Sequence, residues 1–301
     1  MPLPRNLHCG PCGWSYPHWN GTVYPKIRPR GFHELEYVSR YFDAVEINTS
    51  FYQPLRPEIV RLWIKKVEQN PKFLFCAKLN RRFTHDRMLA QDEIKTFKEG
   101  LWPLLQSKKF GCLLMQFPWT FRYTEENRAY FIKVRRAFGE FPLAAEMRHN
   151  SWSHDEAVGT FIDHRVAFCN IDQAAYTKAM APTEFVTSPI VYVRLHGRNP
   201  QDWTQEFAKA GKPAARHDYL YSMPELIDWR DRIDRMHPYA SSAFVFMNND
   251  IGGKAIVNGI QLAELLGDDR RRAPAELARR YPVEMAGLKA EGPMQSRLFA
   301  A

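Results

Sequence analysis

Several features that would by themselves define a class of protein are missing from this sequence of 301 residues. No apolar run approaches the roughly 20 residues of a membrane-spanning helix, so we expect no membrane partner. Residues 1–5 contain no apolar stretch of the kind found in secretory signal peptides, which predicts a cytoplasmic location. Internal repeats and low-complexity segments are absent as well. The length is enough to bury a sizeable core, and one α/β domain accounts for it.

Cysteine is scarce, with five residues in the chain. Cys76, Cys112 and Cys169 fall inside apolar runs, where cysteine usually serves as a small buried hydrophobic residue. Cys9 and Cys12 have C-x-x-C spacing, but a loop-like segment follows them instead of the helix that a thioredoxin-type motif requires. No second pair completes a four-cysteine zinc site. A structural role is therefore favoured over redox or metal chemistry.

Positive charge is in excess, because 42 Lys and Arg face 33 Asp and Glu and give a formal net charge of +9. Such a balance favours anionic partners, either nucleic acid or a phosphorylated small molecule.

Eight short apolar runs, most of them followed by a turn and a helix-like stretch, are spaced along nearly the whole chain. This alternation is typical of a (β/α)8 barrel of the TIM type, with eight parallel strands and an active site where the strands end. The runs are Leu7–Gly13, Ala44–Asn48, Phe73–Lys78, Gly111–Gln116, Leu143–Arg148, Val166–Asp172, Ile190–His196 and Ser242–Asn249.

Segments with a spacing of three to four residues between apolar positions predict the helices. They are Phe32–Tyr41, Glu58–Val67, Ile94–Leu105, Glu125–Phe138, Glu156–Phe161, Met223–Met236 and Lys254–Leu266. The helix after the sixth strand is weak, and Gln173–Met180 is expected to be irregular. Gly197–Arg216 reads as a long loop over the barrel mouth. We place the barrel at residues 1–267 and a basic C-terminal extension, partly helical or mobile, at residues 268–301, with one helix expected at Ala275–Arg280.

Polar residues stand at the end of almost every predicted strand. They are Glu46 and Asn48, Lys78, Gln116, Glu146 and Arg148, Asp172, Arg194 and His196, and Asn248 and Asn249. Side chains alternate between the two faces of a strand, so Glu46 and Asn48 share one face. For the same reason Glu146 shares a face with Arg148 on the fifth strand, and Arg194 shares one with His196 on the seventh. Their apolar neighbours take the face toward the helices. We therefore predict a polar pocket at the mouth of the barrel.

The residue types suggest roles within this pocket. Glu46 and Glu146 could act as general acid and base if their surroundings separate their pKa values. The same carboxylates could instead only neutralise Lys78 and the arginines, which closes the barrel top without chemistry.

Anion binding is the second predicted role of the pocket. Lys78, Arg148 and Arg194 suit an anionic group, since arginine binds such groups through paired hydrogen bonds. His196 could carry a proton or bind a metal, and Asp172 is a further catalytic candidate. No cofactor is predicted. A divalent metal is possible, although a multinuclear zinc site needs more inward histidines than the one clear candidate here.

Aromatic residues gather near the same strand ends. They are Trp14, Tyr16, Trp19, Phe51, Tyr52, Trp119, Tyr123, Trp152, Trp203, Tyr219 and Tyr221. Of these, Tyr16, Tyr52 and Trp152 are our candidates for substrate binding, because aromatic rings stack on bases and sugar rings. Packing of the loops against the barrel is the alternative explanation.

Five separated segments together resemble the YecE-like family, also called domain of unknown function 72, over about residues 8–266. They are Cys12–Trp19, Val45–Tyr52, Glu146–Trp152, Tyr192–Gly197 and Phe246–Ala255. The resemblance implies a (β/α)8 barrel and supplies no reaction. Cys9 lies outside the family pattern, and the family usually has a small residue in place of Cys12, which weakens any role for this pair.

The last residues contain a separate motif. Gln295, two variable residues, Leu298 and Phe299 are similar to the pentapeptide that binds the bacterial replication sliding clamp. In such a peptide the Leu and Phe enter an apolar pocket and the Gln forms hydrogen bonds beside it. An inert tail is the alternative.

These observations favour an enzyme, hydrolase-like, that acts on a phosphodiester or sugar–base bond of nucleic acid at the barrel mouth. Two alternatives remain. The first is a hydrolase, isomerase or lyase that acts on a phosphorylated or carboxylated sugar. The second is a non-catalytic protein that binds nucleic acid or serves as an adaptor.

Overall fold

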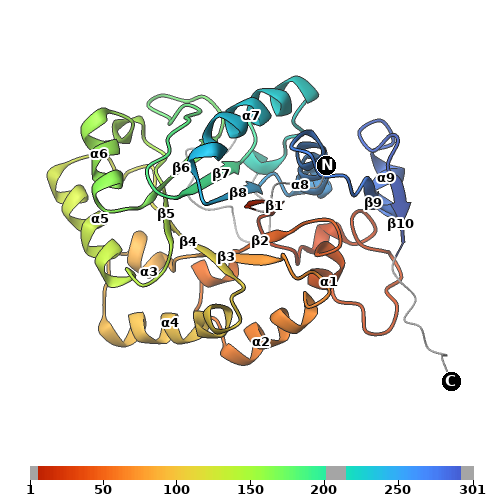
Figure 1. Ribbon diagram of the computed structural model, residues 1–301, viewed down its shortest axis with the longest axis horizontal. Helices are drawn as coiled ribbons and strands as arrows, with labels where there is room; N and C mark the ends of the chain where they lie inside the picture. The colour runs from red at the N-terminus through yellow and green to blue at the C-terminus, as the bar shows by residue number, and fades with distance from the viewer. Residues whose placement is uncertain (1–5, 201–214, 293–301) are drawn as a thin grey trace.

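The chain forms a parallel eight-stranded barrel in the computed structural model, which describes residues 6–200 and 215–292 (Figure 1). The strands neighbour one another in the order β1-β8-β7-β6-β5-β4-β3-β2. Their bounds are β1 Leu7–Pro11, β2 Ala44–Ile47, β3 Leu74–Lys78, β4 Phe110–Gln116, β5 Leu143–Glu146, β6 Ala167–Asp172, β7 Ile190–Leu195 and β8 Ser242–Met247. Seven of the predicted apolar runs contain one of these strands, the eighth, Gly111–Gln116, lacks only the first residue of β4, and the predicted (β/α)8 fold is confirmed.

The barrel closes between β1 and β2 at the level of Cys12 and Glu46. These two residues form a parallel bridge, and the Gly13 amide donates to the Glu46 carbonyl oxygen at 2.8 Å. A Cβ atom on Gly10 would lie 1.8 Å from the Ala44 carbonyl oxygen. Only glycine leaves room for so close an approach of the two strands.

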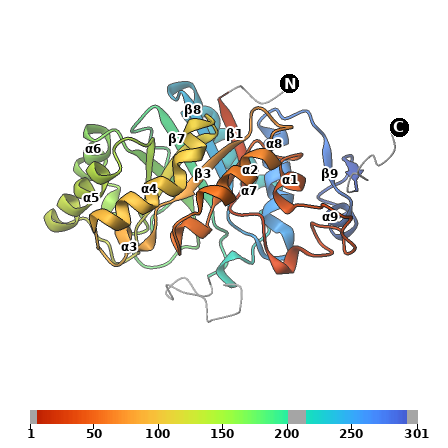
Figure 2. The same ribbon diagram turned by 90° about the horizontal axis from the view of Figure 1, so that it is seen from below.

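Helices surround the barrel on the outside. Figure 2 shows α2 and α4 side by side across it, with α5 and α6 at one end. The helix bounds are α1 Glu34–Val38, α2 Pro57–Lys66, α3 Arg81–Thr84, α4 Gln91–Gln106, α5 Glu125–Ala137, α6 Asp155–Asp163, α7 Met223–Met236, α8 Lys254–Leu265 and α9 Ala275–Arg280. Residues 173–189, between β6 and β7, contain no helix, as the weak pattern there predicted. Among the described residues, no helix has both the length and the apolar character needed to cross a bilayer.

Single turns of 3-10 helix follow several strand ends and bring side chains to the mouth. Their bounds are η1 Pro17–Trp19, η2 Thr49–Phe51, η3 Asn150–Trp152, η4 Ala215–His217, η5 His237–Tyr239 and η6 Ile251–Gly253. The turns η1, η2, η3 and η6 come shortly after β1, β2, β5 and β8. Residues close in sequence to a strand end therefore lie around the opening of the barrel.

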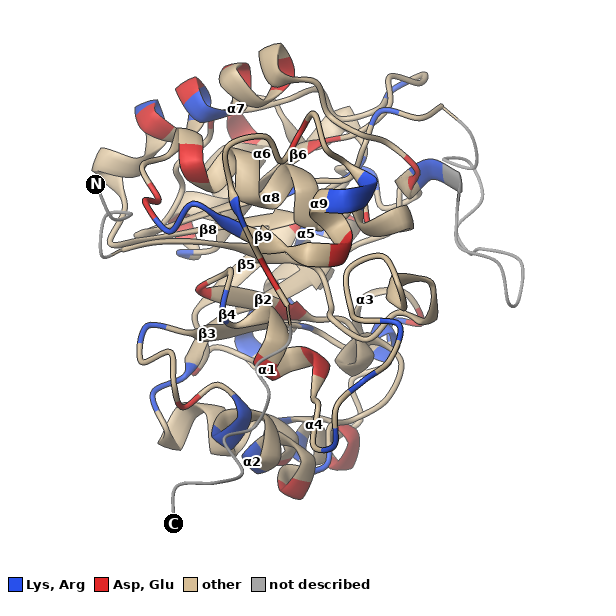
Figure 3. Cartoon of the chain, turned by 90° about the vertical axis from the view of Figure 1, so that its right-hand side faces the viewer, with Lys and Arg blue, Asp and Glu red and all other residues tan. Residues whose placement is uncertain are grey.

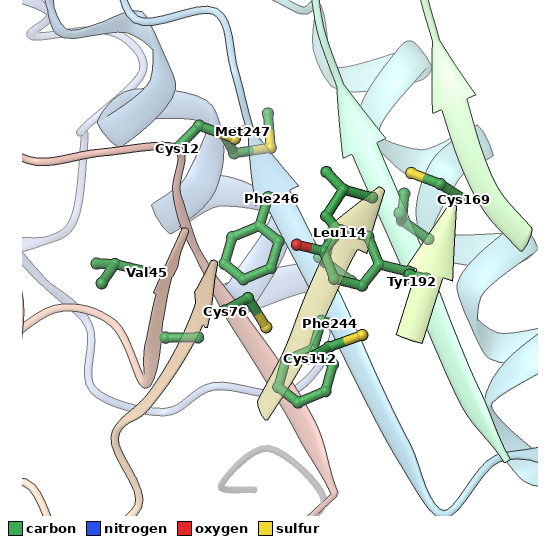
Figure 4. Close-up of a cluster of buried hydrophobic side chains, with 14 of the residues drawn as sticks. Cys12, Val45, Cys76, Cys112, Leu114, Cys169, Tyr192, Phe244, Phe246 and Met247 are labelled. Carbon is green, nitrogen blue, oxygen red and sulfur yellow. The ribbon is translucent and has the colours of Figure 1, made fainter. Parts of the chain in front are cut away.

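The lower part of the barrel interior is apolar. Figure 4 shows side chains from several strands pointing toward one another there, among them Cys76, Cys112, Leu114, Tyr192, Phe244 and Phe246, all of which are buried. Cys9 and Cys12 are also buried and free, and burial raises the pKa of both thiols. The structure therefore supports the structural role expected for the cysteines.

The residues after α8 pack against the barrel. Strands β9 Arg272–Pro274 and β10 Lys289–Glu291 form a small parallel sheet, and α9 confirms the helix expected at its position. Leu277 and Met285 are buried, and Arg270 Nη1 lies 3.0 Å from Asp43 Oδ1 of the barrel. The boundary at residue 267 stays a prediction, and so does the mobile part of the extension, because residues 293–301 are outside the described ranges.

Candidate functional site

A buried ionic cluster lies at the upper end of the barrel interior, with Arg194 of β7 at its centre. Its guanidinium donates to Glu46 through Nη2 at 2.8 Å and to Glu146 through Nη1. All three side chains are fully buried. Tyr192 adds a hydrogen bond from its hydroxyl to Glu46 Oε2 at 2.8 Å, and Arg148 Nε donates to Glu146 Oε1 at 2.9 Å. Both carboxylates are thus occupied by protein groups.

The electrostatics of this cluster keep Glu146 ionised. Burial alone would raise the pKa of its carboxyl, but the positive charge of Arg194, with contributions from Arg148 and from a hydrogen bond to His196, holds the pKa well below its usual value. A carboxylate of such low basicity is a poor proton acceptor at neutral pH. The acid–base roles predicted for Glu46 and Glu146 stay predictions, and the contacts favour the alternative that the pair neutralises arginine.

A cavity of about 550 Å³ opens at the barrel mouth, a size that suits a small-molecule ligand. Most of the predicted binding residues line it: Tyr16, Asn48, Tyr52, Lys78, Gln116, Arg148 and Asn248. Strand alternation explains why they converge. Lys78 and Gln116, at the ends of β3 and β4, lie on the same inward face as the apolar residues beneath them.

Lys78 is the cavity residue whose chemistry stands out. Its Nζ lies 4.6 Å from the centre of the Phe51 ring, and no hydrogen bond or ion pair joins it to any residue that the structure describes. Burial, reinforced by the positive charge of Arg194, lowers the pKa of Lys78 to about 8. About a tenth of this amine is therefore neutral at pH 7, and about half is neutral at pH 8.

Three histidines stand at or below the cavity, and all are neutral at pH 7. Burial lowers the pKa of His196 and of His217 to about 3, and that of His85 to about 4. Asn248 Nδ2 lies 2.9 Å from His196 Nδ1, while His196 Nε2 lies 3.3 Å from Glu146 Oε2 and 3.5 Å from Arg194 Nη1. His196 is buried under the cavity, whereas His85 and His217 line it.

Three predicted site residues lie elsewhere. Asp172 ends β6 on the outward face, where it pairs with Arg198 at 2.7 Å and accepts a hydrogen bond from Trp229 of α7. Asn249 is buried and donates to Tyr219 and Asn258. These side chains do not line the cavity, because partners from outside the barrel hold them.

Trp152 is the third of these residues. Its ring is fully buried and stacks on Phe121, and its Nε1 donates to the Phe121 carbonyl oxygen at 2.7 Å. Of the other aromatic residues, Phe51 and Trp119 line the cavity, while Trp14 and Trp19 are buried in the core. The rings that line the cavity are placed where they could stack on a ligand, whereas the buried rings pack the loops against the barrel. Trp203 lies outside the described residues.

The cavity also contains residues that the sequence analysis did not single out: Tyr176, Arg216, His217 and Asp250. Arg216 is the last residue of the long segment after β7 that is predicted to be a loop over the mouth, and His217 directly follows it. Asp250 directly follows two predicted residues at the end of β8. Its place in the chain was a usable signal, whereas Tyr176 sits in an irregular segment with no strand beside it.

In residues 6–200 and 215–292, no three His, Cys, Asp or Glu side chains are grouped so that they could hold a metal ion. A divalent metal stays a possibility stated from the sequence alone.

The comparison with known proteins decides the family. The family model described as "Protein of unknown function DUF72" matches residues 8–282. The chain belongs to this family. Among DUF72 relatives, it is 29% identical over 278 residues to the UPF0759 protein YunF of Bacillus subtilis, covering 86% of this chain and 94% of YunF. It is also 30% identical over 145 residues to the UPF0759 protein YecE of Escherichia coli, covering 48% of each chain.

Solved DUF72 structures share the fold. A family protein of Thermotoga maritima matches with a TM-score of 0.75 at 25% identity, over 87% of this chain and 99% of the other. One from Enterococcus faecalis also matches with a TM-score of 0.75, at 27% identity, over 86% of this chain and 95% of the other. The expected resemblance to the YecE-like family is confirmed.

Proposed function

We propose that the barrel mouth is the active site of an enzyme that acts on a small anionic, hydroxylated substrate, such as a phosphorylated or carboxylated sugar. The observation that carries this proposal is the charge of the cavity. Lys78, Arg148 and Arg216 line it, against one carboxylate among the described residues, Asp250, which pairs with His18 at 3.3 Å. An anion in the cavity would therefore be surrounded by net positive charge. The protein walls have a lower dielectric constant than water, which strengthens this attraction.

Buried polar atoms support a substrate with hydroxyl groups. Asn48 Oδ1 and Trp119 Nε1 are both buried, line the cavity and have no hydrogen-bond partner among the described residues. Leaving such atoms unpaired costs about 1–3 kcal/mol each. A sugar hydroxyl supplies the donor that Asn48 lacks and the acceptor that Trp119 lacks.

The roles of the cavity residues follow from these contacts. Arg148, steadied by Glu146, and Arg216 bind the anionic group. Asn48 and Trp119 orient the hydroxyl groups. Lys78 exchanges a proton with the substrate near neutral pH. Its pKa of about 8 means that both the charged form, which can give a proton, and the neutral form, which can take one, are populated there. The reaction is then a hydrolysis, an isomerisation or an elimination.

Binding of ribose 5-phosphate should weaken as the pH rises through about 8. The phosphate is already dianionic there, with a second pKa of about 6, while Lys78 loses its charge. We expect affinity to fall about tenfold from near pH 7 to above pH 9, as measured by isothermal titration calorimetry. The Lys78→Gln variant should bind weakly with a flat pH profile. Arg61→Gln, on the exposed face of α2, is the matched control. Equal affinity for wild type and Lys78→Gln across this range would contradict the proposal.

An enzyme of nucleic-acid metabolism is the second candidate, with one nucleotide turned into the mouth. The net charge of +9 and the exposed ring of Tyr52 beside the cavity favour it. Against it, Figure 3 shows both signs of charge mixed on α7 and α2, and many of these charges pair, as Arg232 does with Asp228. DNA binding that weakens steeply with salt would support this candidate; no binding at low salt would exclude it.

The sliding clamp is a proposed partner of the C-terminal motif, which lies outside the described residues. A peptide of residues 290–301 should bind the clamp with a Kd near micromolar, because ordering a short peptide costs entropy. Changing Leu298 and Phe299 to Ala should abolish binding in fluorescence anisotropy, since each side chain contributes about 1.5–3 kcal/mol. Arg297→Ala, at a variable position, is the control. Retained binding by the double variant would end this proposal.

A further inference from the structure

The surroundings of Lys78 differ from those of an ordinary charged lysine at a barrel mouth. The two carboxylates nearest to it in the barrel interior, Glu46 and Glu146, are committed to Arg194, Tyr192 and Arg148. Instead of an acid, its Nζ faces the ring of Phe51 at 4.6 Å. Lys254, by contrast, forms an ion pair with Asp218.

Burial and two neighbouring arginines disfavour a charged amine at this position. Burial is the main cause of the lowered pKa of Lys78, and the positive charges of Arg194 and Arg148 add to it against the opposing charges of Glu46 and Glu146. The imidazole of His85, packed edge-on against Phe51 with ring centres 5.1 Å apart, is neutral. A lysine that lines a cavity, has no bound acid and stands beside other cations has the features of an amine nucleophile.

We propose that Lys78 forms a Schiff base with the carbonyl carbon of an anionic aldehyde or ketone bound in the cavity. This inference rests on the proposed function and names its substrate class: a phosphorylated or carboxylated carbonyl compound. Arg148 and Arg216 line the same cavity and hold the anionic group while the carbonyl carbon approaches Nζ.

The chemistry balances without a further reactant. Neutral Nζ donates its electron pair to the carbonyl carbon, the carbonyl π pair moves to oxygen, and one proton passes from the nitrogen to that oxygen to give the neutral carbinolamine. The hydroxyl then takes one proton from the solvent and leaves as water while the nitrogen pair forms the C=N bond, which leaves a protonated imine. No oxidation or reduction occurs. The imine then withdraws electrons from the adjacent carbon, which serves an isomerase or a lyase.

Trapping of the imine by reduction with cyanoborohydride tests the inference on the full chain. Dihydroxyacetone phosphate and pyruvate are the anionic probes, and acetone is the neutral comparison. After reduction with cyanoborohydride, peptide mass mapping should place the adduct on Lys78 with occupancy at least about tenfold above that on Lys254. Labelling by either anionic probe should exceed labelling by acetone, and should rise with pH toward and beyond about 8. Adducts spread over the lysines according to exposure would overturn the inference.

A conservative variant separates this inference from the proposed function. Lys78→Arg keeps the positive charge, so it should still bind ribose 5-phosphate and lose the trapped adduct. Its circular dichroism spectrum checks folding. Binding of ribose 5-phosphate to the wild type without any trapping of the two carbonyl probes would reject the Schiff base and leave the anion site standing. Neither binding nor trapping would reject both.

Discussion

Replacing Arg194 by Met is expected to lower the free energy of unfolding by about 3–5 kcal/mol, measured by urea denaturation. The guanidinium is fully buried and is the shared partner of Glu46 and Glu146. Its removal leaves two carboxylates without their main counter-charge in a low-dielectric interior. Arg61→Met, on the exposed face of α2, should change stability by no more than about 0.5 kcal/mol.

The pH dependence of this loss has a definite sign. The depressed pKa of Glu146 contributes stability above its unfolded value of about 4.5, and the contribution disappears as pH falls through the folded value. In the Arg194→Met variant only Arg148 still pairs with Glu146, and we expect burial to outweigh this single partner and to raise that pKa, so that protonation relieves the remaining charge. The difference in free energy of unfolding between wild type and Arg194→Met should therefore shrink from pH 7 to pH 5. Adding Glu46→Gln and Glu146→Gln to the variant should restore part of the lost stability. A loss below about 1 kcal/mol at pH 7 would mean that the cluster does not depend on Arg194.

Replacing Gly10 by Ala is expected to cost about 3 kcal/mol or more, because the new Cβ would meet the Ala44 carbonyl oxygen at 1.8 Å. The obstacle is the backbone of β2, which is tied to β1 and β3 and cannot turn away as a side chain could. Relief requires the two strands to separate where the barrel closes. Thermal and urea denaturation both measure the loss.

Gly159→Ala is the matched control for this substitution. Gly159 lies inside α6, and no atom stands within 4 Å of the position its Cβ would take. Alanine there should stabilise the protein by about 0.5–1 kcal/mol, since it is the better helix former. If Gly10→Ala is as stable as wild type to within about 0.5 kcal/mol, the close contact between β1 and β2 is not needed for folding.

Strand alternation explains which site residues could be predicted from the sequence. On β2, β5 and β7, a charged residue at the inward position is separated from the next polar residue by one apolar residue, and the structure shows Glu46, Glu146 and Arg194 pointing inward. For Asp172 the inward direction has to be taken from the register with the neighbouring strand, because its own strand ends in a polar residue on the outward face. It lies two residues after Asn170, and both face outward, whereas Cys169 and Ile171 face the interior with the register of Tyr192 and Arg194.

The order of the strands, the parallel barrel and the end of the barrel that carries polar groups follow from the sequence, because they depend on local periodicity and on short connections. Which groups pair could be seen only in the tertiary structure. Arg194 meets Glu46 from 148 residues away and Glu146 from 48 residues away, and Trp229 reaches Asp172 across 57 residues. These pairings decide that the two glutamates are neutralised below the cavity while Lys78 stands in it without an acid. Such contacts depend on the level of each side chain along the barrel axis and on partners from distant segments, neither of which a local pattern of residues contains.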